Sequence, residues 1–431
     1  MNENLHPAEQ IVMIMERVYK YGMTTISGGN LSILDENGDL WITPSGIDKG
    51  TLTMDDIMCV KKDGTVIGKH KPSVELPFHQ GIYEARPDIN AVVHAHPPAL
   101  VSFSMARKGP NPKLLLHAYK SVADSLQVAP YAIPGSDKLK ENISAEFAKG
   151  GDAVILENHG IVVGKPTIFD AFMLFETLED TACMEINARN IGKPFELTEQ
   201  NLKEIDLYKV DKLTQIEMKH HSVEEVSCRQ EMIRLLERLY DRQLFTSISG
   251  SFSTRLKDGS ILITPSQQDR KYIKEDELVL VHHEFSEAGK EPCEFYELHQ
   301  KIYELNLELT SVIIANPRFL MAYAVTDVKY NTHIIPEAYI VLRDIDKVPF
   351  GMGEDHNRMI ADKLAEDNPV LLIENGYAVV SGKSLLSVFD RLEVAEYSAK
   401  ALVYAKSIGE VIDISDEDIE EIIEGFKLIA K

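Results

Sequence analysis

The sequence predicts an α/β protein built from two similar domains, in each of which helices cover a central sheet. Two observations predict this fold class. The same series of segments occurs twice along the chain, and within each copy helical periodicities alternate with short apolar strands bounded by turn residues. One copy has about 200 residues, an ordinary size for a single domain. We therefore divide the 431 residues into domains 1–215 and 216–431, with a polar connection at about 193–227.

The first predicted element in each copy is an amphipathic helix. Its apolar residues fall on one helical face between Pro7, near its start, and Gly22, just past its end. The second copy repeats the spacing of these apolar residues, and Glu16-Arg17 recurs at 237–238. The two copies therefore share their opening helix.

The remaining predicted elements also recur in order. The paired segments are ISGGNLS with ISGSFS, LWITPSG with ILITPSQ, PSVELPFHQGIY with PCEFYELHQKIY, AVVHAHP with VIIANP, and VILENHGIVVGK with LLIENGYAVVSGK. A long helix at 172–192 is echoed at 389–409. Because the strands are short and interrupted by turn residues, the sheet need not be purely parallel.

Charge and composition exclude some classes of partner. The chain carries 45 basic and 68 acidic residues, a net charge of −23, which argues against a broad surface for nucleic acid or anionic membranes. No apolar run reaches membrane-spanning length. Four scattered cysteines, with no secretory signal, indicate reduced thiols. We therefore expect a cytoplasmic protein that binds neither nucleic acid nor membrane.

The strand INAVVHAHPPAL, from Ile89, carries the first candidate chemistry. Alternate residues of a strand point to one face, so His94 and His96 leave it side by side, before two prolines end it. Two such imidazoles can form half of a transition-metal site. An H-x-H pair taken alone is more often a hydrogen-bonded pair, so this interpretation depends on other segments.

Further polar residues follow other predicted strands. His159, in ENHG, could complete a three-histidine site, although alone it also fits a turn or core histidine. Glu75 opens a helix for which Ser73 is the candidate N-cap, and a helix-start carboxylate is common without catalysis. The SGGN and TPSG segments could form anion-binding nests or plain turns.

The second copy serves as an internal control for these candidates. Six positions have changed there while the surrounding pattern persists: His94 aligns with Ile314, His96 with Asn316, His159 with Gly376, Glu75 with Phe295, Asn30 with Ser251, and Gly46 with Gln267. Residues needed for folding should survive in both copies, and those needed for chemistry can be lost from one. His79 recurs as His299, so we assign it to structure. We expect the second copy to be non-catalytic.

These motifs resemble the class II aldolase/adducin family, typified by the zinc-dependent fuculose-phosphate and rhamnulose-phosphate aldolases. The motifs SGGNLS, TPSG, KPSVE, HAHP and ENHG occur in family order in the first copy, and the second copy has the pattern without the metal residues. The resemblance implies two tandem αβα layered domains around a mainly antiparallel sheet. It also implies oligomers with sites at subunit boundaries, so we expect a homo-oligomer in which a dimer of this chain mimics a four-domain tetramer.

The resemblance also implies roles for individual residues. The zinc ligands, or ligands of another divalent transition metal, fall on His94, His96 and His159, and the acid/base carboxylate falls on Glu75. The phosphate-binding positions fall on Gly29, Asn30, Gly46 and Ser73. Val74 stands where the family's aldolases commonly have a second hydroxyl residue, and the glycine turn has one extra Gly. Tyr119 is the candidate for the family's assisting tyrosine.

The implied activity is that of a metal-dependent aldehyde-lyase. It would cleave a sugar, which we expect to be phosphorylated, by retro-aldol chemistry through a metal-bound enediolate. Alternatives with the same site are a sugar-acid phosphate decarboxylase, a dehydratase or a 4-epimerase, although the family's epimerases usually have Asp in place of Glu75. A non-catalytic, adducin-like binding protein is the alternative from a different class.

Overall fold

The structure is a computed structural model, which describes residues 5–122, 125–210, 212–218 and 220–428. The described residues form two compact units. Unit 1 contains the residues up to Pro112 together with Ala118–Cys183, and unit 2 contains Lys113–His117 and the residues from Met184 onward. The predicted division of the chain at residue 215 stays a prediction.

Unit 1 alternates helices with short strands. Its elements are α1 (Pro7–Lys20), β1 (Asn30–Leu34), β2 (Leu40–Ile42), the 3-10 turn η1 (Met54–Asp56), β3 (Met58–Val60), β4 (Val66–Ile67), α2 (Leu76–Ala85), β5 (Ala91–Ala95), α3 (Pro98–Met105), η2 (Pro112–Leu114), α4 (Leu116–Val122), β6 (Leu126–Ala129), α5 (Asp137–Phe147), β7 (Ala153–Leu156), β8 (Gly160–Lys165) and α6 (Ile168–Ile191). Of these, η2, α4 and α6 extend into residues that belong to unit 2.

The strands of unit 1 form one mainly antiparallel sheet. Their order is β4-β3-β2-β1-β5-β8-β7-β6, and within the described residues only the pair β6–β7 is parallel. Every residue of β5 is buried, as expected for a strand that has neighbours on both sides and helices on both faces. The predicted layered α/β fold with a mainly antiparallel sheet is confirmed.

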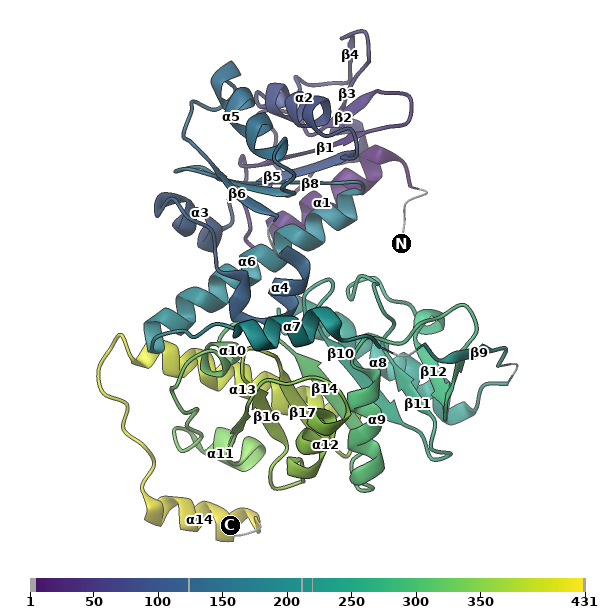
Figure 1. Ribbon diagram of the computed structural model, residues 1–431, viewed down its shortest axis with the longest axis vertical. Helices are drawn as coiled ribbons and strands as arrows, with labels where there is room; N and C mark the ends of the chain where they lie inside the picture. The colour runs from purple at the N-terminus through teal and green to yellow at the C-terminus, as the bar shows by residue number, and fades with distance from the viewer. Residues whose placement is uncertain (1–4, 123–124, 211, 219, 429–431) are drawn as a thin grey trace. The chain divides into compact units, whose positions relative to one another are not determined.

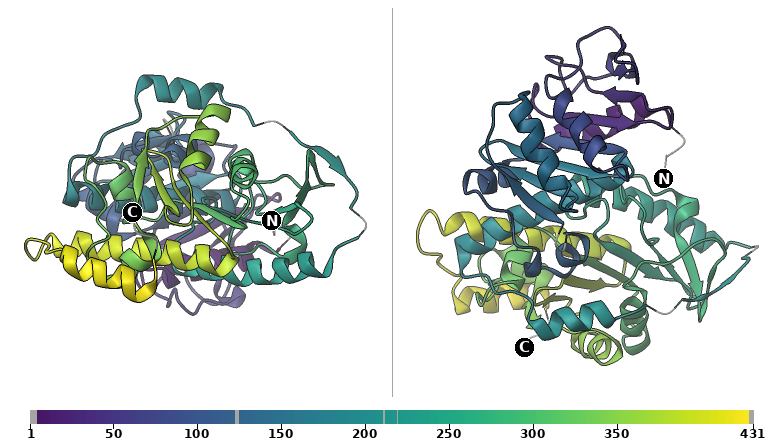
Figure 2. Two further views of the ribbon diagram at one scale, coloured as in Figure 1. Left: turned by 90° about the horizontal axis from the view of Figure 1, so that it is seen from below. Right: turned by 45° about the horizontal axis from the view of Figure 1, so that its top comes forward.

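Helices cover both faces of this sheet. Figure 1 shows α2 and α5 on one face and α1 and α6 on the other, and Figure 2 shows α2 and α5 side by side. Under α2 and α5 lies a hydrophobic core that includes Phe78, Ile82, Val92, Ile143 and Phe147. The site described below lies where the central strands β5 and β8 meet their turns.

Unit 2 repeats this plan. Its further elements are α7 (Glu199–Leu207), β9 (Thr214–Ile216), α8 (Val223–Asp241), β10 (Ser251–Arg255), β11 (Ile261–Ile263), η3 (Glu275–Glu277), β12 (Val279–His282), β13 (Phe285–Glu287), α9 (Tyr296–Leu305), β14 (Ser311–Ala315), α10 (Leu320–Ala324), α11 (Pro336–Leu342), β15 (Asp346–Val348), α12 (Glu354–Lys363), β16 (Val370–Ile373), β17 (Ala378–Gly382), α13 (Leu385–Ala405) and α14 (Asp416–Phe426). Its sheet order, β15-β16-β17-β14-β10-β11-β12-β13, reproduces the order of unit 1, and β9 is added at the edge.

One repeated dipeptide has a packing explanation. Arg17 of α1 is buried, and its guanidinium lies 4.4 Å from the ring centre of Phe172 in α6. In unit 2, Arg238 of α8 lies 4.3 Å from the ring centre of Phe389 in α13. Such cation–π contacts hold the first helix of each copy against its long helix. Both copies therefore place this arginine over a phenylalanine of the long helix, buried at Arg17 and exposed at Arg238.

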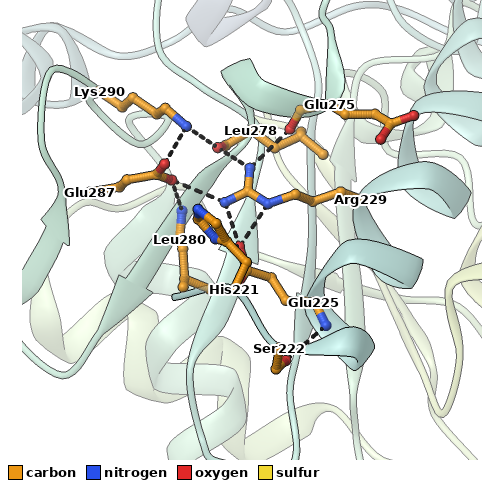
Figure 3. Close-up of polar contacts among 9 residues, drawn as sticks. All are labelled: His221, Ser222, Glu225, Arg229, Glu275, Leu278, Leu280, Glu287 and Lys290. Atoms are coloured by element: carbon orange, nitrogen blue, oxygen red, sulfur yellow. Dashed lines mark hydrogen bonds and ion pairs between the residues drawn. The ribbon is translucent and has the colours of Figure 1, made fainter. Parts of the chain in front are cut away.

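The added edge strand of unit 2 lies beside a buried polar cluster (Figure 3). Arg229 of α8 donates to Glu225 at 2.7 Å, to the carbonyl of Leu278 at 2.6 Å and to Glu287 of β13 at 3.0 Å. Glu287 also pairs with β9, because β13 and β9 form a parallel ladder. The guanidinium of Arg229 thus donates hydrogen bonds to acceptors on several elements at once, and these bonds hold α8 against this edge of the sheet.

Candidate metal and catalytic site

Three histidines, far apart in the sequence, come together in unit 1. His94 is the fourth residue of β5, His96 follows the end of that strand, and His159 lies in the turn between β7 and β8. Ligand nitrogens of the three rings lie within 4.8 Å of one another, and the Nε2 atoms of His94 and His96 are 3.2 Å apart. Within the described ranges, this is the one group of three such side chains arranged to hold a metal ion.

Pro97 and Pro98, directly after His96, begin α3: Pro97 is its N-cap and Pro98 its first residue. The strand that carries the two histidines therefore ends here. The first N–H groups of α3 are accepted by a buried carboxylate, since Glu179 of α6 accepts from Ala99 at 3.1 Å and from Leu100 at 2.9 Å. A carboxylate is favourable at a helix N-terminus, where N–H groups lack helical partners. The chain that leaves His96 is therefore anchored directly behind the site.

His159 reaches the other two rings through a tight turn. Asn158 has a positive φ of 54°, and its N–H donates to the carbonyl of Ser104 at 3.3 Å. Gly160 follows, and a Cβ atom there would lie 2.6 Å from the carbonyl oxygen of Ala95 and 2.7 Å from the His96 ring. Glycine at this position therefore lets the turn approach the end of β5.

The donor set fits a divalent transition metal. His94 Nδ1 lies 2.8 Å from the carbonyl oxygen of Ile161, which can only accept, so Nδ1 carries the hydrogen and Nε2 presents its lone pair toward His96. Burial lowers the pKa of His96 to about 3 and the pKa of His159 to about 4. Neutral imidazoles whose lone pairs converge are the form of histidine that binds metal ions.

Glu75 faces the same group. Its Oε2 lies 3.3 Å from His94 Nε2 and its Oε1 lies 3.5 Å from His159 Nε2. Burial raises the pKa of this carboxyl, but interactions that favour its charged form, among them the hydrogen bond donated by Asn30 Nδ2 at 2.7 Å, outweigh burial and lower the pKa. Oε1 is buried and has no hydrogen-bond partner among the described residues, so an acceptor atom remains directed at the three rings.

The helix that carries Glu75 begins later than the sequence indicated. Ser73 was the expected N-cap, but α2 begins at Leu76 and its N-cap is Glu75. Pro77 in the first turn fits this later start, because proline is tolerated where helical N–H groups lack partners. Ser73 instead accepts the backbone N–H of Glu75 at 3.2 Å through its hydroxyl. The carboxylate thus sits on the helix terminus itself.

The predicted phosphate-binding residues lie on three loops. Asn30 begins β1 opposite His94, and Gly29 precedes it with a φ of +72°. Gly46 lies in the TPSG turn, which runs beside the KPSVE turn because Ser73 N–H donates to the carbonyl of Thr43 at 3.2 Å. The roles of these residues in phosphate binding stay predictions. So does the role of Tyr119, which is half-buried in α4.

Sequence reasoning missed one buried cation near these loops. Lys49 is 2% exposed, its Nζ donates to the carbonyl of Pro44 at 2.6 Å, and burial lowers its pKa to about 8. Arg270 occupies the corresponding position of unit 2 and donates to Pro265 at 2.9 Å. A basic residue at this place in both copies was the available signal. It indicates that the cation braces the turn in both units.

In unit 2 the corresponding place is filled by other groups. Ser249 donates to Asn316 Oδ1 at 2.8 Å, and Asn316 Nδ2 donates to the carbonyl of Gly376 at 2.7 Å. The ring of Phe295, which replaces the glutamate, lies 4.8 Å from the ring of Tyr377. Amide and aromatic groups thus stand where unit 1 has its three imidazoles and carboxylate.

In unit 2, the segment Lys113–His117 lies against the turn that contains Gly376. Asn375, beside Gly376, donates to the carbonyl of Leu114 at 2.9 Å and accepts from the N–H of Leu116 at 2.8 Å. Leu114, Leu115 and Leu116 are all buried. Apolar packing at this position leaves it poorly suited to a charged substrate or a hydrated cation.

Among the described residues, no helix combines the length and apolar character needed to cross a membrane.

Comparison with known proteins gives the same family for both copies. Residues 9–186 and residues 230–403 each match the family described as class II aldolase and adducin N-terminal domain. A stretch of 182 residues is 33% identical to a 3-oxo-tetronate 4-phosphate decarboxylase of Haemophilus influenzae, covering 42% of this chain and 86% of that protein.

Two aldolases are similar to the chain to the same degree. A 5-deoxy-D-ribulose 1-phosphate aldolase of Bacillus thuringiensis is 32% identical over 211 residues, covering 46% of this chain and 92% of that protein. An L-fuculose phosphate aldolase of Methanococcus maripaludis is 36% identical over 179 residues, covering 42% of this chain and 93% of that protein. Each relative therefore corresponds to about one of the two matched segments.

Proposed function

The chain belongs to the class II aldolase and adducin family and is an enzyme of the aldolase-type lyase family, and we propose that its unit 1 cleaves a phosphorylated sugar by retro-aldol chemistry. The observation that carries the proposal is the convergence of His94, His96 and His159 with Glu75 beside them. Two relatives whose names are those of sugar-phosphate aldolases support the substrate class.

The three imidazoles would hold the metal, for which we propose Zn²⁺ or another divalent transition ion. All three donors are nitrogens, a set typical of catalytic zinc, and the fourth position would remain for substrate. A bound cation there supplies Lewis-acid stabilisation of the negative charge that develops as the carbon–carbon bond breaks, an effect worth several kcal/mol. The hydrogen bond from His94 to Ile161 keeps this ligand in one tautomer.

Glu75 is the proposed proton carrier. Retro-aldol cleavage removes a proton from a substrate hydroxyl as the aldehyde forms, and the other fragment takes up a proton at carbon. Oε1 has no hydrogen-bond partner among the described residues and faces the three rings, so it is the atom at which we propose the proton is held. Gly29, Asn30, Gly46 and Ser73 are the proposed phosphate-binding residues, and Tyr119 the proposed assisting tyrosine.

The test is Glu75→Gln, which removes the proton acceptor at little change in shape. We expect kcat on the best substrate among ketose 1-phosphates to fall by about 10²-fold to 10⁴-fold, the usual contribution of a positioned acid or base, with metal content unchanged. Glu84→Gln is the matched control, because Glu84 lies on the same helix α2 with its side chain 68% exposed. Aldehyde release is measured with and without a chelator. Wild-type turnover by the metal-loaded E75Q protein would remove Glu75 from this role.

A second candidate activity is decarboxylation of a phosphorylated oxo-sugar acid. The similarity to a 3-oxo-tetronate 4-phosphate decarboxylase supports it as strongly as other similarities support aldol cleavage. Both reactions break a bond to a carbon next to a carbonyl group and need the same charge stabilisation. Product analysis separates them, since one releases an aldehyde and the other carbon dioxide.

We also propose that unit 2 is non-catalytic, because Ile314, Asn316, Gly376 and Phe295 stand at the positions of the three histidines and the glutamate. The division between the domains is proposed at residue 215. A cytoplasmic location is proposed because Cys59, Cys183, Cys228 and Cys293 are all free thiols, which reducing compartments preserve.

Finally, we propose that the chain self-associates as a dimer, which brings four family domains together. Apolar side chains beside the site support a covering surface, since Val74, Tyr131 and Ile133 are 66%, 52% and 70% exposed. They lie on neighbouring loops, because a Cβ on Gly135 would lie 2.8 Å from the Val74 carbonyl oxygen. Exposed apolar side chains gathered at one place are typical of protein interfaces.

A further inference from the structure

A buried chain of hydrogen bonds runs beneath Glu75. Tyr83 OH and Ser32 Oγ are 2.6 Å apart, Ser32 Oγ and His79 Nδ1 are 2.6 Å apart, and His79 Nε2 contacts Asn30 Oδ1. Asn30 Nδ2 then donates to Glu75 Oε2 at 2.7 Å. Tyr83 is 8% exposed and the other side chains of the chain are still less so. This series of hydrogen bonds therefore joins the core of unit 1 to the Glu75 carboxylate.

The direction of every bond in this chain follows from its last acceptor. The Glu75 carboxylate only accepts, so Asn30 turns Nδ2 toward it and presents Oδ1 to His79. His79 Nε2 must then carry its hydrogen. Nδ1 of the neutral ring accepts from the Ser32 hydroxyl, and Ser32 Oγ accepts from the Tyr83 hydroxyl.

Moving the His79 hydrogen to Nδ1 is unfavourable at two contacts, one with Asn30 and one between Asn30 and Glu75. Burial lowers the pKa of His79 to about 3, so the ring carries a single hydrogen. If that hydrogen moved to Nδ1, the lone pair of Nε2 would face Asn30 Oδ1. Flipping the Asn30 amide would relieve that contact, but it would turn Oδ1 against the carboxylate of Glu75. An unpaired polar contact of this kind, buried, costs about 1–3 kcal/mol.

Unit 2 retains the inner part of the chain without its outer end. Ser253 Oγ lies 2.7 Å from both Tyr303 OH and His299 Nδ1, and His299 Nε2 lies 2.7 Å from Ser251 Oγ. Ser251 replaces the asparagine, and Phe295 replaces the glutamate. The Tyr-Ser-His part therefore belongs to the fold of both units, and its extension to a carboxylate is found in unit 1.

We propose that His79, held in one tautomer by Ser32 and Tyr83, is a positioning residue that fixes the Asn30 amide and, through it, the Glu75 carboxylate. Asn30 then serves orientation of the carboxylate through both polar atoms of its side chain, leaving one Nδ2 hydrogen for a substrate oxygen. The turnover readout below rests on the proposed lyase function, and the structural readout does not.

The test compares Ser32→Ala with its counterpart Ser253→Ala in the full-length protein. Both serines are fully buried and make the same two contacts, so both variants should lose similar thermal stability. We expect S32A to lower kcat on a ketose 1-phosphate by about 10-fold to 100-fold with metal content unchanged, because small misplacements of a reacting group have effects of this size. S253A should stay within about twofold of wild type.

Crystal structures of both variants supply the second readout. In S32A the Glu75 carboxylate should shift or split between conformers, and in S253A it should keep its wild-type position. Wild-type kcat and an unmoved Glu75 in S32A would overturn the proposal, as would an equal loss of kcat in S253A. If the wild type cleaves none of the ketose 1-phosphates, the proposed function fails and the Glu75 position alone decides this inference. Should S32A not fold, Tyr83→Phe against Tyr303→Phe makes the same comparison.

Discussion

Gly29 combines a left-handed backbone with a close approach to the histidine strand β5. Its φ is +72°, and a Cβ atom there would lie 2.7 Å from the carbonyl oxygen of His94 and 3.1 Å from Ala95 Cα. Glycine therefore lets the first loop lie directly against β5 at the histidine. A side chain at this position would strain φ and push β1 away from β5.

Replacing Gly29 with Ala should destabilise the protein by about 2–4 kcal/mol, about 1 from the left-handed conformation and the rest from the backbone overlap. Gly22→Ala is the matched control, because Gly22 has the same φ of +72° and nothing lies within 4 Å of the added Cβ. It should cost about 1 kcal/mol. The free energy of unfolding from urea titration measures both, and equal losses would contradict the packing explanation.

The sequence predicted those site residues that differ between the two copies and missed the role of a residue that both copies share. His94, His96, His159 and Glu75 were singled out from their own segments and supported by their loss from the second copy, and the structure brings them together. His79 recurs as His299, so recurrence assigned it to structure alone. A residue that supports the fold in both copies and orients a carboxylate in one cannot be recognised by its recurrence.

The repeated segments predicted the order of helices and strands. Helical and strand periodicities depend on local burial, which both copies preserve. The N-cap of α2 was predicted at Ser73 but is Glu75, although the Ser73 hydroxyl accepts the N–H of Glu75. Capping residues compete for nearby backbone groups, so helix termini are hard to fix from sequence.

The edge of the second sheet also escaped prediction. The pairing of β9 with β13 joins residues about 70 positions apart, as in Thr214 with Phe285. The arginine that braces this edge, Arg229, has no sequence signal beyond a charge on a helix, although it is 6% exposed. Long-range contacts of this kind follow from tertiary packing, which overrides local propensity.

The duplication gives the protein two units with the same fold and different residues at the corresponding place. Unit 1 retains all the candidate ligands, and unit 2 retains the fold with the corresponding place filled by Phe295 and Asn316. Loss of the ligands without loss of the scaffold is the observation behind the proposal that unit 2 is non-catalytic. Because the net charge of the protein is −23, the protein as a whole does not attract anions, and an anion could bind unit 1 only through groups in local loops.

Assembly should therefore be measurable on the intact protein. We expect sedimentation at micromolar concentration to give twice the mass of one chain, as closed twofold association is the commonest form of oligomer. Ile133→Glu, at a side chain that is 70% exposed, should shift the protein toward the monomer without unfolding it. A wild type that sediments as a monomer would contradict the proposed dimer.

The metal content of the purified full-length chain shows whether the three imidazoles of unit 1 bind a metal ion. Elemental analysis after dialysis should find one divalent transition-metal ion per chain, because three converging imidazoles occur in unit 1 and their counterparts in unit 2 are Ile314, Asn316 and Gly376. His159→Ala should lose that ion. The absence of bound metal from the wild type, or two ions per chain, would contradict the account.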